Sequence, residues 1–344
     1  MMALPSCEPA AERVRASAVA IQGGYDDATD TAVVGIRIDG TGVTCTGSLV
    51  APNLVLTAQH CVASVPTGPL DASTTFGALR PARALYVTTR ATFSVRSADY
   101  HRVAEVLVPP GERRVFGEDI ALVVLAAAVA PSEATPLALR LSTPPAADEL
   151  YSAIGYGATS AFGTDNDRRR RLDDRAVRCV ARGCYDGGGN PNEWVGDEGP
   201  CAGDSGGPAL DSAGRVLGVM ARGAVNCGNP MYTLLSPFRD WLVREAVRVA
   251  LAAGSSPPDW ASDGGASDGG VSDGATPDAS LADAGASDAQ VVDARGADAP
   301  AQVARVESGC HAAPSSATDL RSRWLFALTL AVTARAARRR RSLA

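Results

Sequence analysis

The amino-acid sequence predicts an all-β domain between Ile21 and Leu235. Apolar, strand-like runs bounded by turn residues recur throughout this region, whereas the spacing typical of amphipathic helices is scarce. The span of about 230 residues from 21 to 253 is long enough to bury two hydrophobic cores. The clearest strand-like runs are Thr31–Ile38, Ser48–Leu56, Ile120–Val129 and Arg215–Met220.

A single helix is expected after these strands. It would begin at Ser236-Pro237, because a capping residue followed by proline favours the first turn of a helix. Its apolar residues could pack one face against the β domain; they are Trp241, Leu242, Val247 and Leu251.

The run from Gly203 to Pro208, Gly-Asp-Ser-Gly-Gly-Pro, has the composition of a nucleophile loop. A substrate backbone can closely approach Ser205 because its neighbours are small, and the N–H of Gly203 is free to donate a hydrogen bond. A serine hydroxyl is a weak nucleophile near neutral pH. It needs a base within hydrogen-bond reach, and the base needs an orienting carboxylate.

Candidates for both partners follow from their context. His60 stands where the apolar run 54–58 meets a turn, and Asp119 stands at the mouth of the buried run 120–125. A charge at such a position needs a partner. The other two histidines, His101 and His311, have no comparable context and are interpreted as surface residues.

The order His60, Asp119, Ser205 and the motifs around these residues resemble the chymotrypsin/trypsin family of serine endopeptidases. Other serine hydrolase folds place the three residues in another order. The motifs are Thr57-Ala58-Gln59-His60-Cys61, Asp119-Ile120-Ala121-Leu122 and the run 203–208, and the likeness extends over residues 21–253. It implies two packed antiparallel six-stranded β-barrels of the chymotrypsin-like kind, a C-terminal helix, and peptide hydrolysis without a cofactor.

The resemblance also implies a role for each residue. Ser205 would attack the scissile carbonyl, His60 would transfer the proton, and Asp119 would orient the imidazole. The backbone N–H groups of Gly203 and Ser205 would form the oxyanion hole.

Activation is the second property that the resemblance implies. Cleavage after Ala20 by another protease would free Ile21, whose ammonium would pair with Asp204. The alternative is that Ile21 is the ordinary start of a strand. Ala20 does not suit a protease that cuts after arginine or lysine, which argues against self-activation of a tryptic kind.

The resemblance places Gly199 at the floor of the primary specificity pocket, with Gly223 and Pro230 in its walls. Glycine offers no charge, so we expect a small or apolar P1 residue in the substrate. Asp197 and Glu198 leave open that a shifted loop brings a carboxylate into the pocket.

The strand beside this pocket departs from the family. Ala221 and Arg222 stand where the family usually has serine and tryptophan. The backbone of residues 221–223 would still pair with substrate, since that pairing needs no particular side chain. Arg222 could favour acidic groups further along the substrate.

Eight cysteines favour an oxidising compartment, and their spacing does not suggest a zinc or other metal site. The resemblance implies the disulfides Cys45–Cys61 and Cys201–Cys227. Cys179 and Cys184 are close enough in sequence to bridge locally. Cys7 and Cys310 remain, one near each end.

The sequence outside the protease-like domain has a different composition. Residues 1–20 are interpreted as a propeptide or a truncated signal region. Residues 254–308 are expected to be a disordered linker rich in Asp, Ala, Gly and Ser, in which an aspartate recurs every five residues from Asp263 to Asp298. A calcium-binding repeat is the alternative, although one carboxylate per repeat supplies few ligands for an ion that takes about 6–8 oxygens.

Residues 309–344 combine Cys310, a short apolar segment at 324–334 and the arginine cluster 338–341. This combination looks like the myxobacterial-type C-terminal sorting tail, which implies display on the surface of a bacterium. The tail would then engage the membrane or the sorting machinery. A plain membrane anchor is the alternative, but the apolar segment is shorter than the ~20 residues that a spanning helix needs.

The leading hypothesis is a secreted or surface-anchored serine endopeptidase whose partners are protein or peptide substrates. The alternative is a catalytically weak homologue that acts as a binding module. Nucleic-acid binding has only the run Arg168–Arg171 in its favour. This run is expected to lie in a solvated polar loop, so nucleic acid is not expected as a partner.

Overall fold

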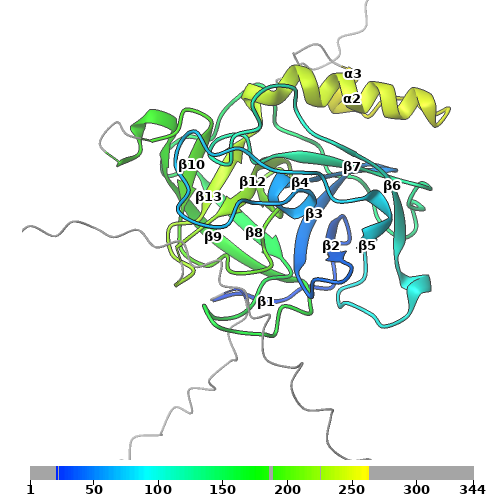
Figure 1. Cartoon of the computed structure of the whole chain (residues 1–344), viewed down its shortest axis with the longest axis horizontal. Coiled ribbons are helices and arrows are strands. Elements are labelled where there is room, and N and C mark those ends of the chain that lie inside the picture. Colours follow the sequence, from blue (N-terminus) through cyan, green and yellow to red (C-terminus); the bar gives the residue numbers. More distant parts are fainter. Residues whose placement is uncertain (1–20, 22, 186–188, 225, 263–344) are drawn as a thin grey trace, which may run out of the picture. The chain divides into compact units, whose positions relative to one another are not determined.

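The computed structural model describes residue 21 and residues 23–185, 189–224 and 226–262 (Figure 1). These residues are mostly strands, and the strands form two closed antiparallel barrels. The prediction of an all-β fold with two six-stranded barrels and a C-terminal helix is confirmed. The predicted leader at 1–20, the aspartate repeat from Asp263 onward, the tail at 309–344 and His311 lie outside the described residues.

The first barrel closes in the strand order β2-β3-β4-β7-β6-β5. The run 48–56 proves to be two strands, because Pro52 and Asn53 form a turn that pairs Ser48 with Leu56 across a hairpin. The core is made by strand side chains such as Ile36, which is fully buried. The strands are β2 (Val33–Ile38), β3 (Thr44–Ala51), β4 (Leu54–Thr57), β5 (Leu85–Thr88), β6 (His101–Leu107) and β7 (Ala121–Leu125).

The second barrel has the order β9-β10-β13-β12-β11-β8 and closes because β9 also pairs with β8, while β1 (Tyr25–Asp26) pairs with the other edge of β9. Aromatic rings fill its interior. The Trp194 and Tyr232 rings stack with centroids 4.2 Å apart, and Tyr151 meets both edge-on. The strands are β8 (Leu150–Gly155), β9 (Arg170–Val180), β10 (Glu193–Gly196), β11 (Pro208–Leu210), β12 (Val216–Arg222) and β13 (Met231–Leu234).

The predicted helix is present as a 3₁₀ turn, η5 (Ser236–Phe238), that leads into α2 (Arg239–Ala252). Trp241 and Leu242 are buried in the core of the first barrel and Val247 is partly buried against it. Leu251 was expected on the same face, but it lies in the last turn of α2 and is 66% exposed. Among the described residues, no helix combines the length and the apolar character needed to cross a membrane.

The remaining helical segments are short. They are α1 (Gln59–Val62), α3 (Asp259–Ser262), η1 (Ala82–Ala84), η2 (Ser97–Asp99) and η3 (Ala181–Gly183). α3 falls in the region expected to be disordered linker. It is held there because Trp260 donates its indole N–H to the Val50 carbonyl at 2.8 Å and Ala261 is buried.

The arginine run 168–171 was expected to lie in a solvated polar loop, and this expectation is wrong. Arg169 and Arg170 are buried, and β9 begins at Arg170. Arg169 pairs with Asp27 at 2.9 Å, and Arg170 pairs with Asp26 at 3.6 Å. Burial of these guanidinium groups is tolerated because each has a carboxylate from the N-terminal segment, so the run fastens that segment to β9.

His101 differs from its surface interpretation in a smaller way. It begins β6, its side chain is only 21% exposed, and its Nε2 lies 2.8 Å from the Glu133 carboxylate. This contact joins β6 to the loop that carries Glu133.

Candidate active site

His60 and Asp119 meet because their two strands pair. β4 ends at Thr57 opposite Ala121 of β7, so the residues just after β4 and just before β7 face one another. The His60 Nδ1 lies 2.7 Å from Asp119 Oδ2, and the backbone N–H of His60 donates to Asp119 Oδ1 at 2.9 Å. A carboxylate only accepts hydrogen bonds, so Nδ1 carries the proton and Nε2 of a neutral ring keeps its lone pair.

The surroundings of His60 set its protonation. Burial alone would lower the pKa of the imidazole, and Arg80 and Arg222 act in the same direction. The charge and hydrogen bond of Asp119 outweigh them, so the pKa of His60 lies above its ordinary value. The ring is therefore a stronger base than a free histidine.

Ser205 lies in the loop before β11, and Thr46 of β3 holds that loop against the first barrel. The backbone N–H of Thr46 donates to the Ser205 carbonyl at 2.8 Å, and its hydroxyl donates to the Gly203 carbonyl at 2.8 Å. Gly206 has φ 84°, and a Cβ there would lie 2.1 Å from Thr57 Oγ1. Only glycine fits after the serine, because the turn is left-handed and strand β4 is close.

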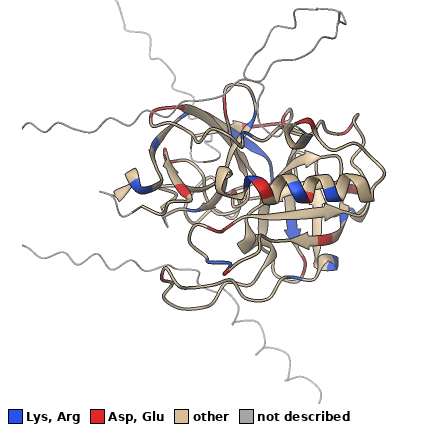
Figure 2. Ribbon diagram, turned by 90° about the horizontal axis from the view of Figure 1, so that it is seen from above, with Lys and Arg blue, Asp and Glu red and all other residues tan. Residues whose placement is uncertain are grey.

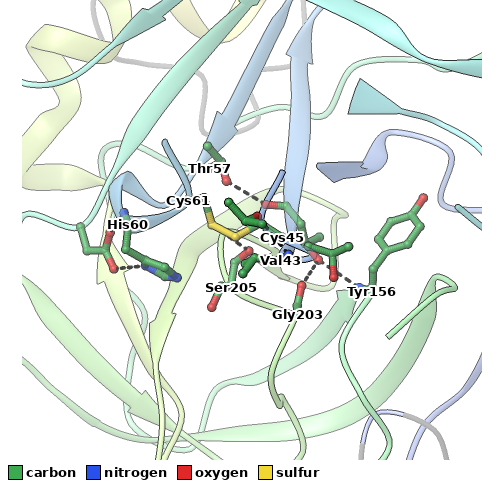
Figure 3. The surroundings of a disulfide bond; sticks show 12 residues. Val43, Cys45, Thr57, His60, Cys61, Tyr156, Gly203 and Ser205 are labelled. Carbon is green, nitrogen blue, oxygen red and sulfur yellow. Dashed lines mark hydrogen bonds and ion pairs between the residues drawn. A yellow bond between two sulfur atoms is a disulfide. The ribbon is translucent and has the colours of Figure 1, made fainter. Parts of the chain in front are cut away.

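The disulfide Cys45–Cys61 joins the two halves of the site. Cys61 follows His60 in α1, and its sulfur lies 3.6 Å from the Ser205 carbonyl oxygen. In Figure 3 the ring of His60 points toward Ser205 beside this disulfide. The same sulfurs and a His60 ring nitrogen are the one group of potential metal ligands found among the described residues, but both sulfurs are bonded to each other and are not thiolates.

All three predicted disulfides are present, including Cys179–Cys184, which bridges residues close in sequence. Cys201–Cys227 fastens the loop before Ser205 to the segment after β12. Cys7 and Cys310 lie outside the described residues.

Asp204 is buried next to Ser205, and burial raises its pKa to about 6. Its carboxylate accepts the backbone N–H groups of Gly157 at 2.7 Å and Cys201 at 2.8 Å. A Cβ on Gly157 would lie 2.1 Å from Asp204 Oδ2, so the absence of a side chain at Gly157 leaves the space that this carboxylate fills.

Ile21 is fully buried and lines the same small cavity as Asp204. It lies in a turn that precedes β1. Its φ is 38°, a left-handed conformation that is strained for a β-branched residue.

Two contacts involve the residues predicted to form the specificity pocket. The N–H of Gly199 faces the Cys227 carbonyl at 3.5 Å. A Cβ on Gly223 would lie 3.7 Å from Pro230 Cα. Ala221 is buried in β12 and presents no polar group there.

The two carboxylates beside Gly199 lie in different directions. Asp197 accepts the Ala176 N–H at 2.9 Å and pairs with Arg178, so it is committed to β9. Glu198 is exposed, and its Oε1 would be 3.3 Å from a Cβ on Gly228. Of the two, Glu198 is the one that lies beside Gly228, which is close in the chain to Pro230.

Sequence reasoning missed three residues that shape the site: Thr46, Thr233 and Glu193. Thr233 of β13 donates its hydroxyl to the Asp119 carbonyl at 3.0 Å. Glu193 of β10 accepts the Gly117 N–H at 2.8 Å and pairs with Arg222. Of these interactions, the sequence pointed only to Arg222, which departs from the residue usual in the family. The partners of Arg222 and Asp119 carried no local signal because they come from distant strands.

Two closed antiparallel barrels, with a histidine–carboxylate pair directed at a serine between small residues, define a serine endopeptidase. The trypsin family model matches residues 21–242. The chain belongs to the trypsin family.

Individual relatives agree with this. Granzyme M of Rattus norvegicus is 28% identical over 219 residues, which is 58% of this chain and 78% of the relative. Serine protease SP24D of Anopheles gambiae is 31% identical over 215 residues, 59% of this chain and 72% of the relative. Brachyurin of Leptuca pugilator is 28% identical over 208 residues, 58% and 85% of the two chains.

Proposed function

We propose that this endopeptidase works through Ser205, His60 and Asp119. The observation that carries the proposal is the 2.7 Å contact between His60 Nδ1 and Asp119, which leaves Nε2 free to accept a proton. Ser205 Oγ bonds to the scissile carbonyl carbon as its proton passes to Nε2. The C–N bond then breaks as His60 returns that proton to the leaving amine, and water hydrolyses the acyl-enzyme ester.

The developing oxyanion is held by the backbone N–H groups of Gly203 and Ser205. Each such donor contributes about 10²–10³-fold to kcat in related chemistry. The anchoring of this loop by Thr46 supports the assignment, because two hydrogen bonds fix the carbonyls of both residues.

A serine-directed fluorophosphonate probe tests the mechanism. We expect stoichiometric labelling of the wild-type chain after it is cut behind Ala20, and no labelling with about a 10⁶-fold lower kcat for Ser205→Ala. Ser212→Ala, in an exposed turn, is the matched control and should behave as wild type. A folded wild-type chain that is cut after Ala20 and neither labels nor cleaves peptides would instead be a binding module.

The P1 preference is proposed to be small or apolar, because Gly199, Gly223 and Pro230 provide no charge. A peptide panel varied only at P1 should give higher kcat/KM for alanine, valine or leucine than for arginine or lysine. Glu198→Gln should leave this order unchanged. A strong preference of the wild type for arginine that is lost in Glu198→Gln would show instead that Glu198 reaches the pocket.

We propose protein or peptide substrates, an activating protease that cuts after Ala20, and an extracellular location at the surface of a bacterial cell. The three disulfides support an oxidising compartment. Figure 2 shows acidic and basic residues interspersed, for example along α2. A nucleic-acid binder would instead gather basic residues on one face. The surface location rests on the tail sequence, and mass spectrometry of the mature C-terminus tests it.

A further inference from the structure

Arg222 and Glu193 form an ion pair at the edge of the proposed catalytic site. Arg222 is the last residue of β12, and two positions earlier the Met220 carbonyl accepts the N–H of Gly206, the residue after Ser205. The guanidinium also lies within electrostatic reach of the catalytic imidazole, because its charge opposes protonation of His60. A charge on this side chain therefore acts where substrate is held.

The guanidinium is engaged on two sides. Its two terminal nitrogens donate to the two carboxylate oxygens of Glu193, with Nη2 at 2.5 Å from Oε2. Its central carbon lies 4.5 Å from the centroid of the Phe116 ring. A guanidinium stacked in this way on an aromatic ring offers a flat face and not a protruding charge.

The Glu193 side chain is also buried and held by several contacts. Its side chain is 6% exposed and that of Arg222 is 18% exposed. Glu193 Oε1 also accepts the Gly117 N–H at 2.8 Å, so one carboxylate ties β10 to β12 and to the segment that leads to Asp119. Arg222 cannot turn toward a substrate carboxylate without leaving Glu193 buried and unpaired, which is strongly unfavourable.

We infer that Glu193 determines specificity by neutralising Arg222, so that the wall formed by Arg222 and Phe116 accepts uncharged substrate side chains and does not select acidic ones. The inference rests on the proposed function and concerns substrate positions beyond P1. It replaces the expectation that Arg222 favours acidic groups. The acidic preference is latent in this chain, and the Glu193 carboxylate suppresses it.

The test compares the wild type with Glu193→Gln in the full-length chain, using peptides that differ only by Glu or Gln at each position from P2 to P4. The wild type should cleave the two peptides of each pair with kcat/KM values within about threefold. Glu193→Gln leaves an uncompensated positive charge. It should raise the Glu-to-Gln ratio at one position by about tenfold or more, and salt should weaken this gain. The double variant Glu193→Gln, Arg222→Gln should return the ratio to the wild-type value.

Two controls separate this effect from a general disturbance. Glu245→Gln breaks another Arg–Glu pair, the 2.7 Å contact with Arg248 on α2, and should not alter any ratio. Arg222→Gln alone leaves the Glu193 charge in place and should shift preference in the opposite sense, toward peptides with arginine at that position.

An unchanged ratio in a folded Glu193→Gln variant would overturn the inference. The wild type alone provides a further test. If the Arg222 cation were free, the wild type would prefer the Glu peptide, and this preference would fall with added salt. That result would also overturn the inference. If the wild type labels with the serine probe and cleaves peptides while either result appears, only the inference fails. If the wild type, cut after Ala20, neither labels nor cleaves, the proposed function fails.

Discussion

Replacing Asp119 with asparagine is expected to lower kcat about 10⁴-fold, as the corresponding change does in other Ser-His-Asp hydrolases. The Asp119 carboxylate holds the proton on Nδ1 of His60. An asparagine amide that presents its NH₂ group to Nδ1 would favour the opposite tautomer, in which Nε2 carries the proton and cannot accept one from Ser205. The domain should remain folded, because the change removes one charge and keeps the shape of the side chain.

The pH dependence of kcat/KM gives a second measure of the same contact. Activity requires neutral His60 and should rise with pH. The midpoint of this rise in the wild type should lie above about 6.5, the ordinary value for histidine, because Asp119 raises the pKa of His60 in spite of burial. In Asp119→Asn the midpoint should move to lower pH.

Asp211→Asn is the matched control for this experiment. Asp211 is also a buried, ion-paired aspartate, since it accepts from Arg215 at 2.9 Å, but it lies in the turn between β11 and β12. It should keep most of the activity. Comparable losses in both variants would mean that destabilisation, and not the His60 contact, explains the effect.

A cut between Ala20 and Ile21 is expected to raise kcat/KM by about 10²–10³-fold, the contribution of one oxyanion donor. Asp204 is buried without an ion-pair partner among the described residues, and burial raises its pKa to about 6. A new ammonium on Ile21, which lines the same cavity, would pair with it and fix the loop that carries Gly203.

The same cut should change how stability depends on pH. The folded-state pKa of Asp204 lies above its ordinary value of 3.8. In the uncut chain the favourable contribution of Asp204 to the free energy of unfolding is therefore present below pH 3.8 and is lost as the pH rises through about 6. The difference between the ordinary pKa of 3.8 and the folded-state pKa of about 6 corresponds to about 3 kcal/mol of unfolding free energy. After the cut, the ammonium lowers the pKa and this loss should disappear.

A variant in which residues 16–20 are replaced by the recognition sequence of a highly specific protease allows the cut to be made at will. Activity is measured before and after cutting, and denaturant unfolding is measured at several pH values in the Ser205→Ala background to prevent self-digestion. Asp204→Asn should abolish both the activation and the pH effect. Full activity in an uncut chain, checked by N-terminal sequencing, or in Ile21→Gly, would contradict the proposal.

The strands and the proposed catalytic residues were predictable because their signals are local. The Ser48–Leu56 run shows the limit of such signals, because both arms of a β hairpin have the same apolar pattern and only a short Pro-Asn turn divides them. Leu251 shows another limit, since its spacing in the sequence suggested the apolar face, but it is 66% exposed in the last turn of α2. The interpretation of Arg168–Arg171 as solvated was wrong because charge indicates exposure only when no partner is available.

The partners that decide these cases are far away in the sequence. Arg169 meets Asp27 across 142 positions and Arg222 meets Glu193 across 29. Neither pair can be recognised before the strands that carry it are placed in a barrel. Thr46 belongs with them, because its bonds to the Ser205 loop span about 160 positions and depend on contact between the two barrels.

The sequence by itself determined the class of fold, the disulfides and the residues proposed for the reaction, because a nucleophile, its base and its carboxylate are recognisable residue types in short motifs whose order is informative. The tertiary structure alone decided what surrounds them. It buries Ile21 beside Asp204, fastens the Ser205 loop through Thr46 and pairs Arg222 with Glu193. The physical reason is that charge compensation and burial depend on which side chains are close in space, and barrel closure sets those distances between residues far apart in the chain.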